Sequence, residues 1–268
     1  MGFSIALLQF KPIRNNTEKN IREIKKSLAG VKADLIVLPE LSNSGYLYDS
    51  PEELEPFSEE NTGHDPYLSA LIELAKSTNA AIVTGYAEKD GVNLYNSAIA
   101  LSPNGPITNY RKTHLFDHEK TLFQPGDTGF KVFEWKNVQI GMMICFDWIF
   151  PEACRCLALA GAQIIAHPAN LVLPFCQNAM ITRSLENRVF TVTANRIGKE
   201  KLADVALNFT GMSQITDPSG AIRYRGPQKK ATLHVMSINP GDASDKKINA
   251  RNDLFNDRRP EMYSLITK

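Results

Sequence analysis

The sequence predicts an α/β fold, a four-layer α-β-β-α sandwich in which an internal pseudo-two-fold relates two mixed sheets. Two observations carry this prediction. The order strand, helix, strand, helix and three strands occurs once in each half of the chain, and each half ends in a hairpin with Pro and Gly in its turn. A single doubly wound sheet is the alternative. Three consecutive strands per half disfavour it, because neighbouring parallel strands need crossover connections.

Hydrophobic periodicity places the elements of the first half. We expect a strand at 3–10, a helix at 16–30, a strand at 33–38, a helix at 66–78, a strand at 80–87 and a hairpin at 94–111 that turns at SPNG. Alternating apolar residues on either side of Pro and Gly indicate that last hairpin.

The second half repeats the order. We expect a strand at 138–145, a helix at 151–160, a strand at 162–167, a helix at 178–188, a strand at 189–196 and a hairpin at 211–225 that turns at DPSG. Residues 1–240 are therefore expected to form one domain. The remainder, 241–268, is polar and rich in turn residues, so we interpret it as an arm that lies on a neighbouring subunit or on the chain's own body.

Composition narrows the classes of partner and compartment. The 268 residues are 43% hydrophobic, carry a formal net charge of +1 and have a pI near 7.7, which disfavours nucleic acid or an anionic membrane as partner and favours a small molecule. No signal peptide or transmembrane-length apolar run is evident, so we expect a cytoplasmic protein. Four cysteines in such a chain are expected to be reduced thiols. Cys154 and Cys156 fall on nearly opposite faces of the predicted helix and are not expected to bind a metal.

Three ionisable residues follow apolar strands. Glu40 follows LIVLP, Lys112 follows NYR and Cys145 follows GMMI. Ligand and catalytic groups of α/β proteins collect at the carboxyl ends of strands, and a carboxylate, an ammonium group and a thiol together could carry out acyl transfer. Taken singly, each has a structural alternative: a turn cap for Glu40, a surface residue for Lys112 and a buried core residue for Cys145.

Cys145 lies where the predicted strand ends and Pro151 begins the next helix. Amides at a helix start carry partial positive charge, which lowers the pKa of a nearby thiol. We therefore expect a reactive thiolate at this position.

These residues resemble the carbon–nitrogen hydrolases of the nitrilase superfamily. The resemblance spans nearly the whole chain and lies in the segments LIVLPELSNSGY, YRKTHLFDHEKTLFQPGD, GMMICFDWIFPEACRCLALAGAQIIAHPAN, LENRVFTVTANRIG, FTGMSQITDPSG and NDLFNDRRPEMY. It implies the same αββα sandwich, with 1–240 as the catalytic domain and the tail as a contact arm of a homodimer or larger homo-oligomer. It also implies a Glu40-Lys112-Cys145 triad that needs no metal or organic cofactor.

The resemblance implies hydrolysis of a non-peptide C–N bond through a thioester on Cys145. Glu40 would act as base, and Lys112 with the backbone N–H of Phe146 would hold the oxyanion. Glu119 matches a second family glutamate that positions substrate and supports the triad.

The sequence Cys-Phe-Asp after the strand resembles the amidase side of the family, whereas Cys-Trp-Glu is usual in its nitrilases. We expect a compact pocket for a short aliphatic amide or ω-amide, with Phe146 beside the nucleophile and a mostly uncharged lining that consists of Tyr46, Trp148, Asn170, Leu171 and Phe175. Nitriles and N-carbamoyl amines or β-amino acids are the alternative substrates. A carbamoyl amino acid would need a cation for its carboxylate, and Arg155 and Arg183 are the candidates.

Other classes of function rest on other residues. His114 and His118 suggest a metal site only if a helix carries both, and no third ligand is evident. His167 suggests a papain-like Cys-His pair, although its place before Pro168 favours a role in ordering a loop. A scaffold that kept the fold and lost the chemistry is the non-enzyme alternative, which the intact Glu40, Lys112, Glu119 and Cys145 disfavour.

Overall fold

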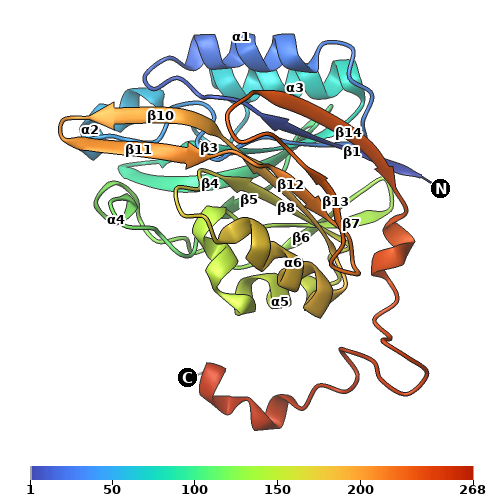
Figure 1. Cartoon of the computed structure of the whole chain (residues 1–268). Coiled ribbons are helices and arrows are strands. Elements are labelled where there is room, and N and C mark those ends of the chain that lie inside the picture. The colour runs from blue at the N-terminus through green and yellow to red at the C-terminus, as the bar shows by residue number, and fades with distance from the viewer. Residues whose placement is uncertain (1, 268) are drawn as a thin grey trace.

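The expected order of strand, helix, strand, helix and three strands is present in both halves of the chain, with further elements added in each (Figure 1). The computed structural model describes residues 2–267. The first half contains β1 (Phe3–Gln9), α1 (Thr17–Leu28), β2 (Leu35–Val37), α2 (Pro51–Leu54), α3 (Pro66–Thr78), β3 (Ala81–Asp90), β4 (Asn93–Ser102), β5 (Gly105–Arg111) and α4 (Glu119–Leu122). The second half contains β6 (Val132–Trp135), β7 (Val138–Met142), α5 (Pro151–Leu159), β8 (Ile164–Ala169), α6 (Cys176–Asn187), β9 (Phe190–Asn195), β10 (Ile197–Leu202), β11 (Val205–Thr210), β12 (Gln214–Thr216), β13 (Ile222–Arg225) and β14 (Thr232–Ile238).

The pseudo-two-fold is visible in the strand order of the two six-stranded sheets. One sheet has the order β14-β1-β2-β3-β4-β5 and the other has the order β6-β7-β8-β9-β12-β13. In each, an antiparallel outer strand is followed by two parallel pairings and two antiparallel pairings. The outer strand of the first sheet, β14, comes from the end of the second half.

The four layers follow from strands that are buried on both faces. In β1, Ile5 and Leu7 belong to the core between the sheets, whereas Ala6 and Leu8 belong to the core beneath α1 and α3. The sheets pack with β2 against β8 and β9. On the other outer face, α5 and α6 cover the second sheet (Figure 1). The sandwich expected from the sequence is therefore confirmed.

Local sequence signals place several helix ends. Asn16 caps α1 by accepting a hydrogen bond from the N–H of Lys19 at 3.0 Å. Pro51, Pro66 and Pro151 occupy the first turns of α2, α3 and α5, where the missing N–H costs nothing. Asn79 ends α3 in the left-handed conformation.

Four strands were not expected from the sequence: β6, β10, β11 and β14. β6 is only four residues long, and β10 alternates Gly, Lys and Glu in place of an apolar run. β10 and β11 form a separate two-stranded sheet. In addition, a short 3-10 helix, Cys145–Ile149, separates β7 from α5.

Among the described residues after Ile238, up to Thr267, the helices are short 3-10 turns, and this segment runs below the body of the molecule (Figure 1). Within residues 2–267, no helix has the length and apolar character needed to cross a membrane.

Candidate active site

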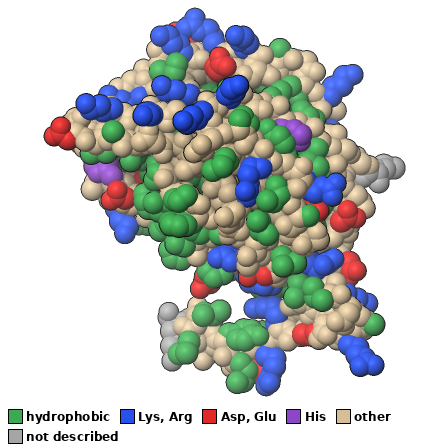
Figure 2. All heavy atoms as spheres, viewed as in Figure 1, with side chains coloured by type: hydrophobic (Ala, Val, Ile, Leu, Met, Phe, Trp, Pro, Cys, Tyr) green, Lys and Arg blue, Asp and Glu red, His purple; other side chains and the backbone are tan. Residues whose placement is uncertain are grey.

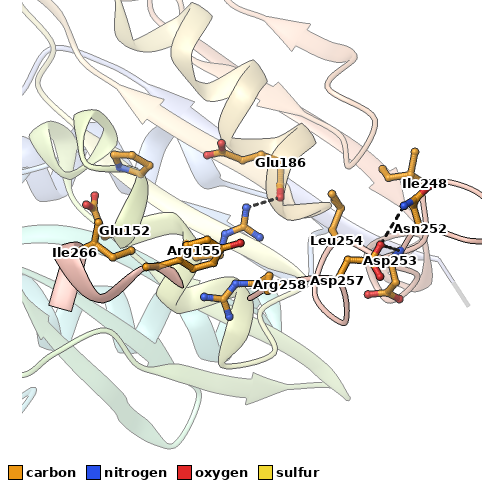
Figure 3. A pocket seen from close by; sticks show the side chains of 12 residues that line it. Glu152, Arg155, Glu186, Ile248, Asn252, Asp253, Leu254, Asp257, Arg258 and Ile266 are labelled. Atoms are coloured by element: carbon orange, nitrogen blue, oxygen red, sulfur yellow. Dashed lines mark hydrogen bonds between the residues drawn. The ribbon is translucent and has the colours of Figure 1, made fainter. Parts of the chain in front are cut away.

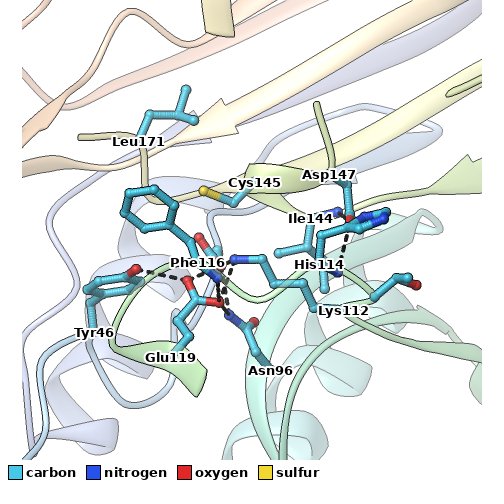
Figure 4. A network of polar contacts seen from close by, with 12 residues as sticks. Tyr46, Asn96, Lys112, His114, Phe116, Glu119, Ile144, Cys145, Asp147 and Leu171 are labelled. Atoms are coloured by element: carbon cyan, nitrogen blue, oxygen red, sulfur yellow. Dashed lines mark hydrogen bonds and ion pairs between the residues drawn. The ribbon is translucent and has the colours of Figure 1, made fainter. Parts of the chain in front are cut away.

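The strand ends bring Glu40, Lys112 and Cys145 together, as expected. Glu40 follows β2, Lys112 follows β5 and Cys145 follows β7. All three side chains are buried, as is that of Glu119 at the start of α4. Figure 4 shows Lys112 and Glu119 pointing toward one another with Cys145 beside them.

Lys112 bridges the two carboxylates. Its Nζ lies 2.7 Å from Oε1 of Glu40 and 2.8 Å from each carboxylate oxygen of Glu119. The Tyr46 hydroxyl donates to Oε1 of Glu119 at 2.8 Å, and Asn96 Nδ2 donates to Oε1 of Glu40 at 2.7 Å. A charged group that is buried away from water is costly unless it is paired and hydrogen-bonded, as these groups are.

The second oxygen of Glu40 is different. Oε2 is buried and has no hydrogen-bond partner among the described residues. A buried carboxylate oxygen without a partner is costly, and it is available to accept a proton from a neighbouring group. The backbone of Glu40 is held against β3, where Gly85 donates its N–H to Pro39 O at 3.1 Å.

Cys145 is presented on a strained turn. Its φ is 41°, in the left-handed region that few residues other than glycine adopt. Asp147 supports the turn, because its Oδ2 accepts hydrogen bonds from the N–H of Ile144 and the hydroxyl of Tyr110, each at 2.8 Å. On the other side, His167 Nε2 lies 3.0 Å from the carbonyl oxygen of Cys145.

The expectation of a resting thiolate is wrong. Burial, with the Glu40 carboxylate second, raises the pKa of the Cys145 thiol well above its usual value, although Lys112 and a backbone hydrogen bond from Asn170 lower it. Cys145 also begins a 3-10 helix of only five residues, and not a long α-helix whose dipole would favour the thiolate. At neutral pH the thiol is protonated and needs a base.

The directions of the pKa shifts of the neighbouring groups agree with an ion-pair cluster. Burial lowers the pKa of Lys112, but the Glu119 and Glu40 carboxylates outweigh it, so that the pKa lies above its usual value. Burial raises the pKa of Glu119 against the opposing effect of Lys112. Lys112 is therefore a permanent cation in this site.

A cavity of about 300 Å³ adjoins the cluster at Tyr46 and Phe116. Leu47 and Tyr48 continue its apolar wall, Asp49 and Asp117 contribute carboxylates, and none of the described residues that line it is Lys or Arg. This volume lies at the lower end of the range for small-molecule sites.

The structure separates the other predicted binding residues from that cavity. Phe146 packs edge-on against Phe116 at a centroid distance of 4.9 Å. Trp148 belongs to the hydrophobic core that includes residues of α5 and α6. Asn170 is buried, and neither its Oδ1 nor its Nδ2 has a described partner. None of these three, nor Leu171 or Phe175, is among the described residues that line the cavity.

The two candidate arginines interact elsewhere. Arg183 pairs with Glu186 at 2.9 Å and donates to the carbonyl oxygen of Trp148 at 3.2 Å. Arg155 donates to the carbonyl oxygen of Glu186 at 2.8 Å. Neither lines the cavity beside Tyr46.

The histidines also have separate contacts. His114 Nδ1 lies 2.7 Å from Asp147 Oδ1, whereas His118 Nε2 lies 2.8 Å from the carbonyl oxygen of Tyr48. Within residues 2–267, no group of three or more His, Cys, Asp or Glu is placed to hold a metal ion. His167 contacts the backbone of Cys145 through Nε2 and Thr193 Oγ1 through Nδ1, so its two ring nitrogens face groups other than the thiol.

Sequence reasoning missed Asn96, Phe116 and Glu200. Asn96 is a buried amide in the middle of strand β4, and Tyr95 and Ala98, which are close to it in the sequence, are aromatic and apolar. Glu200 accepts hydrogen bonds from the N–H groups of Tyr46 and Leu47 at 3.0 and 2.8 Å. Because Glu200 stands between two exposed lysines, the sequence does not indicate that its side chain is buried in this contact.

Comparison with known proteins identifies the family of the chain. Residues 4–247 match the family model for carbon–nitrogen hydrolases. A protein named nitrilase from Pyrococcus abyssi is 42% identical over 97% of this chain and 98% of its own, and an (R)-stereoselective amidase from a Pseudomonas species is 30% identical over 95% and 91%. The crystal structure of a carbon–nitrogen hydrolase from Helicobacter pylori G27 shares the fold, with a TM-score of 0.89 over 100% of this chain and 99% of that one at 21% identity. The chain belongs to the carbon–nitrogen hydrolase family of the nitrilase superfamily.

Proposed function

We propose that this carbon–nitrogen hydrolase cleaves the C–N bond of a small, uncharged amide, with Cys145 as nucleophile, Glu40 as base, and Lys112 and Glu119 as supporting charges. One observation carries the proposal. Glu40 binds Lys112 and Asn96 through Oε1 and leaves Oε2 without a described partner in a site that also contains a protonated thiol.

In the first half-reaction, Oε2 of Glu40 takes the thiol proton while Sγ attacks the carbonyl carbon of the substrate. The Lys112 ammonium and the backbone N–H of Phe146 stabilise the negative charge on the former carbonyl oxygen. Glu40 then gives its proton to the leaving nitrogen. Ammonia departs, and a thioester remains on Cys145.

In the second half-reaction, Glu40 accepts a proton from water, which attacks the thioester carbonyl and releases the acid. The proton returns to Sγ and restores the thiol. Lys112 keeps its charge throughout, because two buried carboxylates hold it. Glu119 orients Lys112 and is itself oriented by Tyr46.

The cavity supports an uncharged acyl group. Its apolar walls suit an aliphatic chain, and the carboxylates of Asp49 and Asp117 disfavour a substrate that carries a second carboxylate. This favours simple amides over N-carbamoyl amino acids and over ω-amides of dicarboxylic acids. Asn170, with an unpaired donor and an unpaired acceptor, is proposed to bind a polar group of the substrate.

Nitrile hydrolysis is the second candidate, and two observations favour it. The relative from P. abyssi is named a nitrilase. In addition, neither Phe146 nor Asp147, the two residues that distinguish Cys-Phe-Asp from Cys-Trp-Glu, is among the described residues that line the cavity, and the fully buried Asp147 holds the Cys145 turn through Ile144.

The test is ammonia release from acetamide, propionamide, hexanamide, succinamate, N-carbamoyl-β-alanine and propionitrile, with Cys145→Ala beside the wild type. We expect turnover of the simple amides, loss of that turnover in Cys145→Ala, and little turnover of the two anionic substrates. A thioester trapped on Cys145 by acid quench and detected by mass spectrometry establishes the intermediate.

Cys156→Ala is the matched control, because Cys156 is exposed and lies outside the site. It should retain wild-type activity. Exclusive turnover of propionitrile would assign the second candidate and reject the amide. Full activity in Cys145→Ala would reject the mechanism for both.

We also propose that the chain self-associates through its C-terminal arm. A cavity of about 570 Å³ lies between α5 and that arm, with Arg155, Leu254, Arg258 and Ile266 in its walls (Figure 3). Hydrophobic side chains gather on the arm in Figure 2. A second copy of the chain that covers these side chains would bury them.

A further inference from the structure

We infer that the hairpin β10–β11 is a flap that selects the acyl group of the substrate, and that the buried Arg196–Glu200 ion pair anchors it to the catalytic cluster. The inference rests on the proposed function, because it assigns the hairpin to the acyl side of the Cys145 site. The hairpin is a two-stranded sheet separate from both six-stranded sheets, and it reaches toward α2 and α4 (Figure 1).

The anchor is an ion pair buried at the base of a surface hairpin. Glu200 is only 7% exposed, whereas its neighbours Lys199 and Lys201 are exposed. Arg196 is fully buried and donates through Nη1 to Glu200 Oε1 at 2.5 Å and through Nη2 to the carbonyl oxygen of Pro12 at 3.0 Å. Removing one partner of such a pair leaves an uncompensated buried charge, so the hairpin is held firmly at this point.

Glu200 reaches the catalytic cluster through Tyr46. Its carboxylate binds the backbone N–H of Tyr46 at 3.0 Å, and the hydroxyl of the same tyrosine donates to Glu119 at 2.8 Å. Phe209 of β11 packs between the anchor and this tyrosine, with Cζ of Arg196 4.0 Å from its ring centroid and the Tyr46 ring edge-on at 5.8 Å. The hairpin therefore holds Tyr46 by its backbone and by its ring, and Glu200 is a positioning residue.

The free end of the hairpin forms one wall of the cavity. Leu202, Val205 and Leu207 face the cavity whose opposite side includes Tyr46 and Phe116. Figure 2 shows basic side chains in a row over β10 and hydrophobic side chains below it. Val205 is 53% exposed, so a larger side chain can be placed there without disturbing the core. It would occupy space that a long acyl chain needs.

The first test compares Val205→Phe with Val92→Phe, the same substitution at a hairpin tip outside the site, where Val92 is 97% exposed. We expect Val205→Phe to lower the ratio of kcat/KM for hexanamide to kcat/KM for acetamide at least tenfold. Val92→Phe should leave that ratio within twofold of the wild type. An unchanged ratio in Val205→Phe would overturn the flap.

The second test addresses the anchor with Glu200→Gln and Glu200→Ala. The glutamine can still accept a hydrogen bond from one N–H of the Tyr46–Leu47 turn, so Glu200→Gln should retain more activity than Glu200→Ala. We expect Glu200→Ala to lower kcat for acetamide at least tenfold and to change KM less than threefold, because Tyr46 and Glu119 are displaced while the small substrate needs little of the wall. A wild-type kcat in a folded Glu200→Ala protein would remove the positioning role.

A readout without turnover separates this inference from the proposed function. Sγ of Cys145 displaces iodide from iodoacetamide or from its N-hexyl derivative, and a thioether forms with loss of the thiol proton to solvent. We expect Val205→Phe to slow the N-hexyl reagent at least fivefold more than iodoacetamide. If it does so in a protein that hydrolyses no amide, the flap stands and the proposed function fails. If amides are hydrolysed without any change in either selectivity, the flap fails and the proposed function stands.

Discussion

Glu40 binds Lys112 and Asn96 through one oxygen and leaves the other without a described partner, and this leads to a prediction at the scale of one residue. Glu40→Gln removes the negative charge that raises the pKa of Cys145 and leaves the Lys112 cation beside the thiol. We expect the thiol pKa to fall while amide turnover drops about 10²- to 10⁴-fold, because the base is lost. The pH dependence of iodoacetamide alkylation measures the first effect and ammonia release measures the second.

A lower thiol pKa together with a lower amide turnover distinguishes a base from a structural residue. A merely disrupted site would lose both reactivity and activity, and circular dichroism would show the disruption. Should Glu40→Gln raise the thiol pKa, or retain turnover, the base would have to be another group.

His167 gives a prediction for stability. Burial lowers the pKa of His167 to about 4, against about 6.5 in the unfolded chain. Above pH 6.5 the residue is neutral in both states and its contribution is complete. As the pH falls from 6.5 to 4, the unfolded chain binds a proton that the folded protein does not, which costs roughly 3 kcal/mol of unfolding free energy.

His167→Asn removes this titration, so urea unfolding should show a flatter pH dependence between 6.5 and 4 for the variant than for the wild type. Asparagine can still donate a hydrogen bond toward the carbonyl of Cys145, and appreciable activity should remain at neutral pH. Complete loss of activity in a folded variant would favour the Cys-His pair.

At the scale of elements, β3 positions the base through close backbone contact. A Cβ built at Gly85 would lie 2.4 Å from Cα of Glu40 and 3.0 Å from the nitrogen of Leu41. Because the obstructing atoms are backbone, Gly85→Ala must push the Glu40 segment away. We expect the unfolding free energy to fall by about 1–3 kcal/mol. We expect kcat to fall by a larger fraction of its wild-type value than the unfolding free energy does.

Gly226→Ala is the matched control, since its Cβ would meet its nearest neighbours at 3.4 Å and its φ lies outside the left-handed region. Thermal unfolding and kcat of the two variants give the comparison. Equal effects from both substitutions would remove the special role of Gly85.

The burial of each strand explains whether the sequence predicts it. β1, β3, β7 and β8 are apolar runs because both of their faces are buried, and periodicity identifies them. β10 has exposed lysines, β11 has an exposed Val205 and Ala206, and both strands lie outside the main sheets, so no hydrophobic pattern reveals them. The buried Arg196–Glu200 pair contacts Tyr46 and Pro12, which are far from the hairpin in sequence, so the sequence does not show where the hairpin lies.

For the site, the sequence predicts that Glu40, Lys112 and Cys145 stand at strand ends. Glu40 and Lys112 follow strands of one sheet and Cys145 follows a strand of the other, so the packing of the two sheets brings them together. The strand ends do not predict the ionisation of the thiol. That depends on burial and on the distance to Glu40, which the sequence does not contain. Trp148 was expected in the pocket from its nearness to Cys145 in sequence, but it packs in the hydrophobic core that includes residues of α5 and α6.

At the scale of the whole molecule, the arm yields a prediction about assembly. Met262 is 64% exposed and Leu265 is 79% exposed. Hydrophobic side chains that are this exposed favour an arm that is covered by a partner over one surrounded by solvent. Deletion of the chain after Lys247 should convert a dimer or larger assembly into a smaller species, measured by size-exclusion chromatography with light scattering. Lys246, which donates to the carbonyl oxygens of Asn187 and Arg188, remains in place.

Leu265→Asp should weaken the assembly in the same direction, and Val92→Asp is its control at an exposed valine far from the arm in sequence. A wild-type chain that is monomeric at all concentrations would reject self-association through this surface.

Because β14 pairs with β1, the first sheet can be completed only after β14 has been synthesised. Phe3 pairs with Ile238, so the edge of the first strand has no permanent neighbour until almost the whole chain has left the ribosome. During that time β1 is an open template for intermolecular pairing. The same adjacency makes the protein suited to circular permutation: a short linker from the end of β14 to Gly2, with new termini at Gly91, would place the two strands next to each other from the beginning of folding.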